Sequence, residues 1–90
     1  MLKTVTIRVS GKVQGVWYRQ GTREKARELG ITGVVRNRPD GTVWITATGT
    51  DKQLEDLITW CHSGPPKARV MQVETSPEIL QEFESFEILR

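Results

Sequence analysis

The spacing of the apolar residues changes from strand-like to helix-like early in this short chain. Residues 4–10 alternate between polar and apolar side chains, which is the period of a half-buried strand. Two glycines then interrupt the alternation. Over residues 18–29 apolar or small side chains recur at helical spacing, and Gly30 follows as a C-terminal cap. This part of the chain predicts a strand followed by a helix.

A turn sequence separates the next two strand patterns. Residues 34–38 and 42–48 flank Pro39-Asp40-Gly41, in which proline restricts φ and glycine tolerates a positive φ. We therefore expect an antiparallel hairpin. Near the C-terminal end, Phe86 and Ile88 alternate with polar residues and predict a final strand.

A second helix is predicted between this hairpin and the final strand. Thr50 with Gln53 three residues later is a capping-box pattern, and Gly64-Pro65-Pro66 ends the helix. Its apolar stripe consists of Leu54, Leu57, Ile58 and Cys61. Residues 69–75 are rich in strand-forming side chains, and we expect the one long, acidic loop near residues 76–82.

The order and number of these elements restrict the fold. A chain of 90 residues suits a single compact domain, which we expect to span residues 1–90. Two helices in so short a chain cannot cover both faces of a sheet, but they can cover one face of a mostly antiparallel sheet. The expected fold is α+β, a ferredoxin-like α/β sandwich with the order βαββαβ and an extra edge strand as an option.

Charge and cysteine content limit the classes of partner. The 13 Lys and Arg against 11 Asp and Glu leave a formal charge of +2, which attracts small anions without requiring a polyanion. Cys61 is the only cysteine, so no intramolecular disulfide is possible. The first residues lack a signal-peptide pattern, and no apolar run approaches about 18 residues. We expect a cytoplasmic monomer without a nucleic-acid or membrane partner.

The junction between the first strand and the first helix carries the signals of an anion site. Gly15 allows a tight turn, and the amides of a first helical turn have no partner in the helix. Arg19 lies in that turn, where a cation opposes the helix dipole unless an anion binds there. The alternative is that Arg19 is a solvated surface residue and the glycines only make a turn. Arg23 and Arg27 extend a basic row that we interpret as a solvated face.

Several motifs together resemble one known family. Gly11 to Arg19, read as Gly-Lys-Val-Gln-Gly-Val-Trp-Tyr-Arg, is similar to the signature loop of the acylphosphatases. Val35-Arg36-Asn37 followed by Asp40-Gly41 resembles their second signature. Further matches cover nearly the whole chain: Ala26, Gly30, Gly33, the segment from Gly64 to Val70, and Phe86-Glu87-Ile88.

The resemblance implies hydrolysis of acyl phosphates to a carboxylate and inorganic phosphate, without a metal or other cofactor. By this likeness the amides from Gly15 through Val16, Trp17 and Tyr18 to Arg19, together with the Arg19 guanidinium, hold the phosphoryl oxygens. Asn37 orients the attacking water. A carboxylate leaving group, with a conjugate-acid pKa near about 4, needs no protonating residue.

Asn37 has a second interpretation, because asparagine commonly starts a turn such as the one at Pro39-Asp40-Gly41. Its amide suits water positioning because it offers an acceptor and donors without a charge that repels phosphate. Two departures from the family pattern bear on substrate preference. Tyr18 stands where phenylalanine is usual, and Arg38, where many animal members have threonine, either raises the local positive potential or points into solvent.

Other conspicuous side chains have structural interpretations. Cys61 and His62 point to different helix faces, and Cys61 lies on the apolar stripe, so we expect a buried core cysteine and no metal site. We interpret Trp44 and Trp60 as packing residues, with Trp60 covering a sheet edge. Trp17 lies inside the loop, where it shields the phosphate, contacts the acyl group or simply packs.

Two alternative functions follow from the same element order. RNA-recognition domains share it, but they stack bases on exposed aromatics of central strands. The first strand here offers Thr4, Thr6, Arg8 and Ser10 on its polar face, and the chain lacks the basic-Gly-aromatic signature. The other alternative is an acylphosphatase-like domain that handles carbamoyl phosphate, as in hydrogenase maturation proteins.

Overall fold

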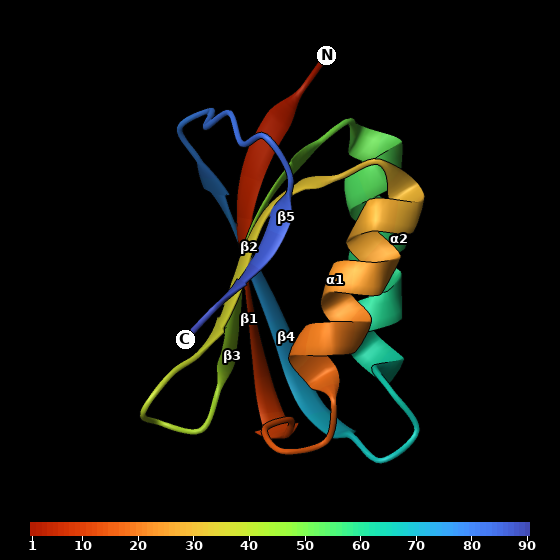
Figure 1. Ribbon diagram of the computed structural model, residues 1–90, viewed down its shortest axis with the longest axis vertical. Coiled ribbons are helices and arrows are strands. Elements are labelled where there is room, and N and C mark those ends of the chain that lie inside the picture. Colours follow the sequence, from red (N-terminus) through yellow and green to blue (C-terminus); the bar gives the residue numbers. More distant parts are fainter.

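The computed structural model describes residues 1–90 and contains one five-stranded sheet with two helices on one face (Figure 1). The elements in chain order are β1 (Lys3–Lys12), α1 (Tyr18–Leu29), β2 (Thr32–Asn37), β3 (Val43–Gly49), α2 (Asp51–Ser63), β4 (Arg69–Glu78) and β5 (Phe86–Leu89). The strand order is β4-β1-β3-β2-β5, and only the β2–β5 pair is parallel. The predicted ferredoxin-like α+β fold is confirmed, with β5 as the extra edge strand.

The strand directions bring two distant parts of the sequence to one edge of the sheet. Both β1 and β2 pair antiparallel with β3, so these two strands run in the same direction on either side of it. Neighbouring strands lie about 4.8 Å apart, which separates the carboxyl ends of β1 and β2 by about 10 Å. The segment that follows β1 and the hairpin that follows β2 therefore meet at the lower end of the molecule in Figure 1.

The end of α1 and the start of α2 both follow from the predicted caps. Gly30 has φ of 80° and donates its amide to Ala26 and Arg27 carbonyls, which ends α1. Thr50 and Gln53 form the predicted capping box at the start of α2. The core between the helices and the sheet comprises Ile7, Val9, Val35, Ile45, Leu54, Leu57 and Phe86, among others. Neither helix is long and apolar enough to cross a membrane.

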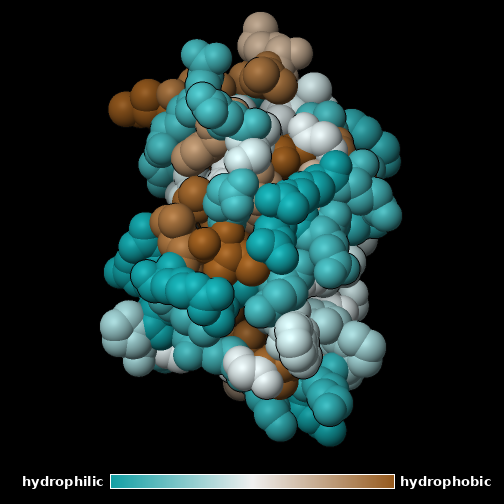
Figure 2. Space-filling view, in the orientation of Figure 1, coloured by the Kyte–Doolittle hydropathy of each residue, from teal (hydrophilic) through white to brown (hydrophobic).

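The predicted acidic loop is displaced from its expected position. Strand β4 continues to Glu78, because residues 76–78 pair with β1 and the Thr6 hydroxyl donates to the Glu78 carboxylate over 3.0 Å. The connection therefore comprises residues 79–85. Figure 2 shows apolar side chains projecting at the upper end of the molecule, and the exposed apolar residues of this connection are Ile79 and Leu80.

The same connection covers one end of the open sheet face. Thr4, expected on an open polar face, is buried, with its hydroxyl 2.6 Å from that of Thr48. The Gln81 amide donates to Thr4 Oγ1 over 2.9 Å, and the Gln81 carbonyl accepts from Thr48. The polar face of β1 is therefore only partly available to solvent.

Candidate active site

The segment between β1 and α1 forms a concave backbone cradle, defined as residues Gly15 to Arg19. Gly15 has φ of 75°, and Trp17, the helix N-cap, has φ of 69° and ψ of 23°. Trp17 is the only residue other than glycine with a positive φ, a conformation that costs a bulky residue about 1–3 kcal/mol and is often found at functional sites. No side chain caps the helix, so the amides of its first turn remain available to a ligand.

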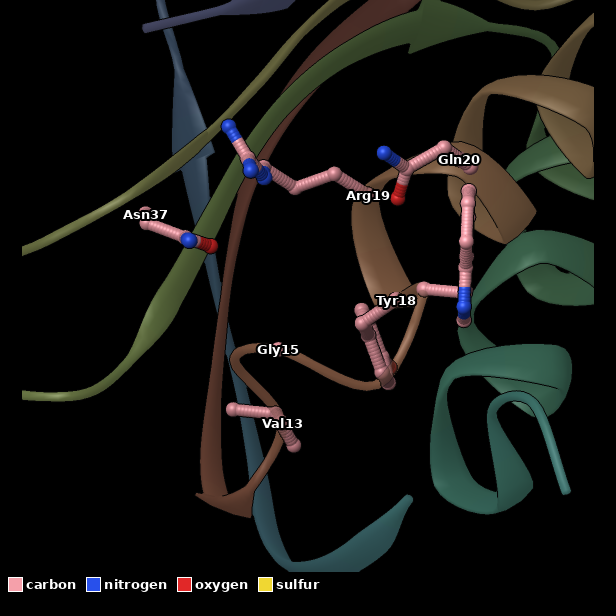
Figure 3. A pocket seen from close by; sticks show the side chains of 7 residues that line it. Val13, Gly15, Tyr18, Arg19, Gln20 and Asn37 are labelled. Carbon is pink, nitrogen blue, oxygen red and sulfur yellow. The ribbon is translucent and has the colours of Figure 1, made fainter. Parts of the chain in front are cut away.

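A cavity of about 280 Å³ opens above the cradle. It is lined by Val13, Gly15, Trp17, Tyr18, Arg19, Gln20 and Asn37. Figure 3 shows the Arg19 side chain extending from α1 and the Asn37 amide extending from β2, with both side chains turned toward the space above Gly15. Of the predicted site residues, only Val16 does not line this cavity. The volume is at the lower end of the range for small-molecule sites.

The charge in this cavity is entirely positive. None of its lining residues is acidic, and the first turn of α1 contains no acidic side chain. Arg19 forms no salt bridge, unlike Lys25 and Arg27 on the same helix. The guanidinium and the positive end of the helix dipole therefore act on the same space, which strongly favours an anion.

Asn37 is the last residue of β2, and its side chain is not used to form the following turn. The turn is closed by the amide of Arg38, which donates to the Thr42 carbonyl, and by Asp40, whose Oδ1 accepts from the Thr42 amide and hydroxyl. These two hydrogen bonds hold the pKa of Asp40 below its usual range. Asn37 Oδ1 is buried and has no hydrogen-bond partner in the protein. A buried acceptor without a partner is unfavourable and is suited to a ligand or water.

Comparison with known proteins gives the family. The family model described as Acylphosphatase matches residues 5–88. The chain belongs to the acylphosphatase family. A protein named "Acylphosphatase" from Acaryochloris marina (strain MBIC 11017) is 54% identical over 82 residues, which are 91% of this chain and 88% of that protein.

Solved acylphosphatase structures have the same fold. The structure of an acylphosphatase from Coxiella burnetii is 35% identical, with a TM-score of 0.95 over 98% of this chain and 93% of that chain. The acylphosphatase from Bacillus subtilis is 31% identical, with a TM-score of 0.95 over the full length of both chains. The resemblance inferred from the sequence motifs is therefore confirmed.

Gln14 is a residue of this acylphosphatase whose part in the site the sequence did not reveal. Its side-chain amide donates to the Arg38 carbonyl over 2.8 Å and to the Thr42 carbonyl over 2.9 Å. One side chain thus joins the segment that leads into the cradle to both sides of the turn that follows Asn37. The only sequence signal was a polar residue immediately before Gly15, within the signature loop.

The aromatic residues beside the cradle have different roles. Trp17 is 69% exposed next to the cavity, which contradicts a simple packing role. Tyr18 is buried, and its hydroxyl donates to the Cys61 carbonyl over 2.7 Å, so the hydroxyl that phenylalanine lacks has a partner. Burial raises the pKa of the Tyr18 phenol far above its usual range. Trp60 does not cover a sheet edge, because it packs against Tyr18 with ring centroids 5.4 Å apart, where Gly21 leaves space.

Arg38 and Cys61 lie outside the cavity. The Arg38 guanidinium lies 4.9 Å from the centre of the Trp44 ring, so this cation stacks on an aromatic side chain. Cys61 is fully buried, and burial raises the pKa of its thiol to about 12, which confirms the predicted core cysteine. His62 is exposed, and no three His, Cys, Asp or Glu side chains form a cluster that could hold a metal.

Proposed function

We propose that this acylphosphatase hydrolyses acyl phosphates by direct attack of water on phosphorus. The amides from Gly15 to Arg19 and the Arg19 guanidinium bind the phosphoryl oxygens, and Asn37 orients the water. A bond forms between the water oxygen and phosphorus while the bond from phosphorus to the acyl oxygen breaks. The products are inorganic phosphate, which retains the oxygen of the water, and a carboxylate.

The observation that carries the proposal is the Oδ1 atom of Asn37, which is buried and has no hydrogen-bond partner in the protein. Asn37 lines the same cavity as Arg19. An acceptor at this position can take one hydrogen of a water molecule and so direct its lone pair toward the cradle. The neutral amide does this without repelling the phosphoryl group. Amides and a guanidinium that are already in place stabilise the charge on the transferring group, which is the main requirement in phosphoryl transfer.

The leaving group explains why the site needs no acidic side chain. A carboxylate is a weak base, with a conjugate-acid pKa near about 4, so it departs without a proton at neutral pH. The cavity lining accordingly offers donors, the amide side chains of Gln20 and Asn37, and no carboxylic acid. We propose that neither a general acid nor a metal ion is required, in agreement with what the family resemblance implies.

The test is hydrolysis of benzoyl phosphate in the presence of a chelator. Arg19→Ala and Asn37→Ala should each reduce kcat/KM by about 100- to 1,000-fold, as expected for the loss of one preorganised group. Arg23→Ala is the matched control for Arg19, because Arg23 lies one turn further along α1 and does not line the cavity. Cys61→Ala should retain activity. A wild-type rate in Asn37→Ala would exclude the water-positioning role, and activity that disappears with chelator would exclude the metal-independent reaction.

The proposal includes the setting in which the enzyme works. We propose a cytoplasmic monomer that acts on a small-molecule substrate, without a nucleic-acid or membrane partner. The single, buried Cys61 suits a reducing compartment, and the formal charge of +2 does not require a polyanionic partner. Sedimentation equilibrium should give the monomer mass, and specific activity should not change with enzyme concentration. A stable dimer, or activity that rises with protein concentration, would contradict this part.

A further inference from the structure

A second cavity adjoins the cradle on the side of the α2–β4 connection. It measures about 600 Å³ and is lined by Lys12, Gln14, Gly15, Val16, Pro66, Lys67, Ala68 and Arg69. The end of β1, the cradle and the segment after α2 each contribute to it, and they lie together at the lower end of the molecule in Figure 1. We call this cavity the basic groove, because its charged residues are all cations.

The cations of the basic groove have no carboxylate partners. Lys12, Lys67 and Arg69 are exposed, and none of them forms a salt bridge, although five other Lys and Arg side chains do. The absence of partners has a simple cause in the sequence. No Asp or Glu occurs in residues 1–23 or 57–73, which supply every residue that lines the basic groove. Three unpaired charges beside one another attract an anion and favour one that carries more than one charge.

Gly15 joins the basic groove to the active-site cavity. It lines both cavities and is itself exposed. A Cβ atom added at Gly15 would meet no other atom within 4 Å, so the space above this residue is open. A phosphoryl group held by the cradle can therefore carry a substituent that passes over Gly15 and enters the basic groove.

We infer that the basic groove binds a second anionic group of the substrate, so that the enzyme prefers acyl phosphates whose acyl part bears a carboxylate or phosphate. This inference rests on the proposed function, because the first phosphoryl group must occupy the cradle. Lys67 and Arg69 bind the distal anion, and the reaction at the cradle is unchanged. The basic groove therefore determines specificity for the acyl part of the substrate, which the cradle and Asn37 do not recognise.

The experiment compares two substrates of equal chain length, hexanoyl phosphate and adipoyl monophosphate, which ends in a carboxylate. For the wild-type enzyme we expect kcat/KM to be about tenfold higher for the adipoyl compound, each rate being referred to uncatalysed hydrolysis. The double variant Lys67→Ala/Arg69→Ala should lose most of this preference, while its kcat/KM for hexanoyl phosphate stays within about twofold. The double variant Lys25→Ala/Lys52→Ala, on the helices, is the matched control and should keep the preference.

The outcomes separate this inference from the proposed function. Failure of the wild-type enzyme to hydrolyse either substrate would overturn the proposed function. Hydrolysis of both substrates with equal efficiency, or an equal loss for both in the Lys67→Ala/Arg69→Ala variant, would overturn the subsite alone. 5-Phosphonopentanoyl phosphate, in which a phosphonate replaces the distal carboxylate of the adipoyl compound, should likewise be preferred to hexanoyl phosphate, and the larger of the two preferences shows which anion the basic groove binds better. In the wild-type enzyme the preference should also decrease as salt is added, because exposed charges are screened.

Discussion

Replacement of Gln14 by methionine tests whether the cradle and the Asn37 turn work as one unit. Methionine has nearly the same length but cannot donate, so Gln14→Met removes the hydrogen bonds to the Arg38 and Thr42 carbonyls. Both carbonyls keep a backbone partner, since the Gly41 amide donates to Arg38 and the Arg38 amide donates to Thr42. Neither carbonyl oxygen is left without a hydrogen-bond donor, so the free energy of unfolding should fall by the net value of two hydrogen bonds, about 1–2 kcal/mol.

The effect on catalysis should exceed the effect on binding. Without Gln14, the turn that follows Asn37 can move relative to the cradle, and a displacement of about 1 Å can reduce a rate by about 100-fold. We expect kcat for benzoyl phosphate to fall by about 10- to 100-fold, while the inhibition constant of inorganic phosphate, which reports on the cradle, changes by less than about threefold. Gln72→Met, on the exposed strand β4, is the matched control. A kcat unchanged in Gln14→Met, or a phosphate affinity that falls in step with kcat, would refute this reasoning.

Three further predictions concern stability, each measured by urea denaturation. Tyr18→Phe should cost about 1–2 kcal/mol, because the phenol donates to the buried Cys61 carbonyl. Burial raises the pKa of the Cys61 thiol to about 12, so the unfolded chain loses this proton first. The contribution of the Cys61 thiol to the free energy of unfolding is complete below about pH 9 and is lost toward pH 12, at up to about 1.4 kcal/mol per pH unit. The free energy of unfolding of Cys61→Ala should therefore decline less steeply over this range. Gly33→Ala should cost about 3 kcal/mol or more, because its Cβ would lie 2.0 Å from the Thr46 carbonyl oxygen. Gly41→Ala, with open space around it, should cost only about 1 kcal/mol.

Each of these three predictions can fail in a distinct way. Equal stability of Tyr18→Phe and wild type would mean that the hydroxyl makes no net contribution. A decline in alkali that is as steep in Cys61→Ala as in the wild type would exclude the thiol as its source. Equal costs for Gly33→Ala and Gly41→Ala would show that the positive φ, and not the close approach to β3, determines the loss.

The sequence predicted the elements whose signals are local. The caps at Gly30, Thr50 and Gln53 act within a few residues, and both helices end or begin where these residues stand. The extent of β4 could not be predicted in the same way. Its last residues are exposed at the sheet edge and are held by pairing with β1, seventy or more positions earlier in the chain. Because these residues are exposed, their pairing does not require alternating apolar side chains, and the sequence has no periodic pattern that predicts it.

The candidate site was predictable in its residues but not in its connections. Gly15, Arg19 and Asn37 could be named because the motifs around them are specific, and the parallel directions of β1 and β2 explain why they share one cavity. The hydrogen bonds of Gln14 depend on how a hairpin more than twenty residues away is placed. The left-handed backbone conformation of Trp17 could not be predicted from the sequence either, because nothing in the residue type requires it.

The most direct test of the proposed mechanism is the fate of the water oxygen. Benzoyl phosphate should be hydrolysed by excess enzyme in water labelled with oxygen-18, and both products should be analysed by mass spectrometry. If Asn37 directs water at a phosphoryl group held in the cradle, the label should appear in inorganic phosphate and not in benzoate. Label in benzoate would mean that water attacks the carbonyl carbon, and it would contradict the mechanism.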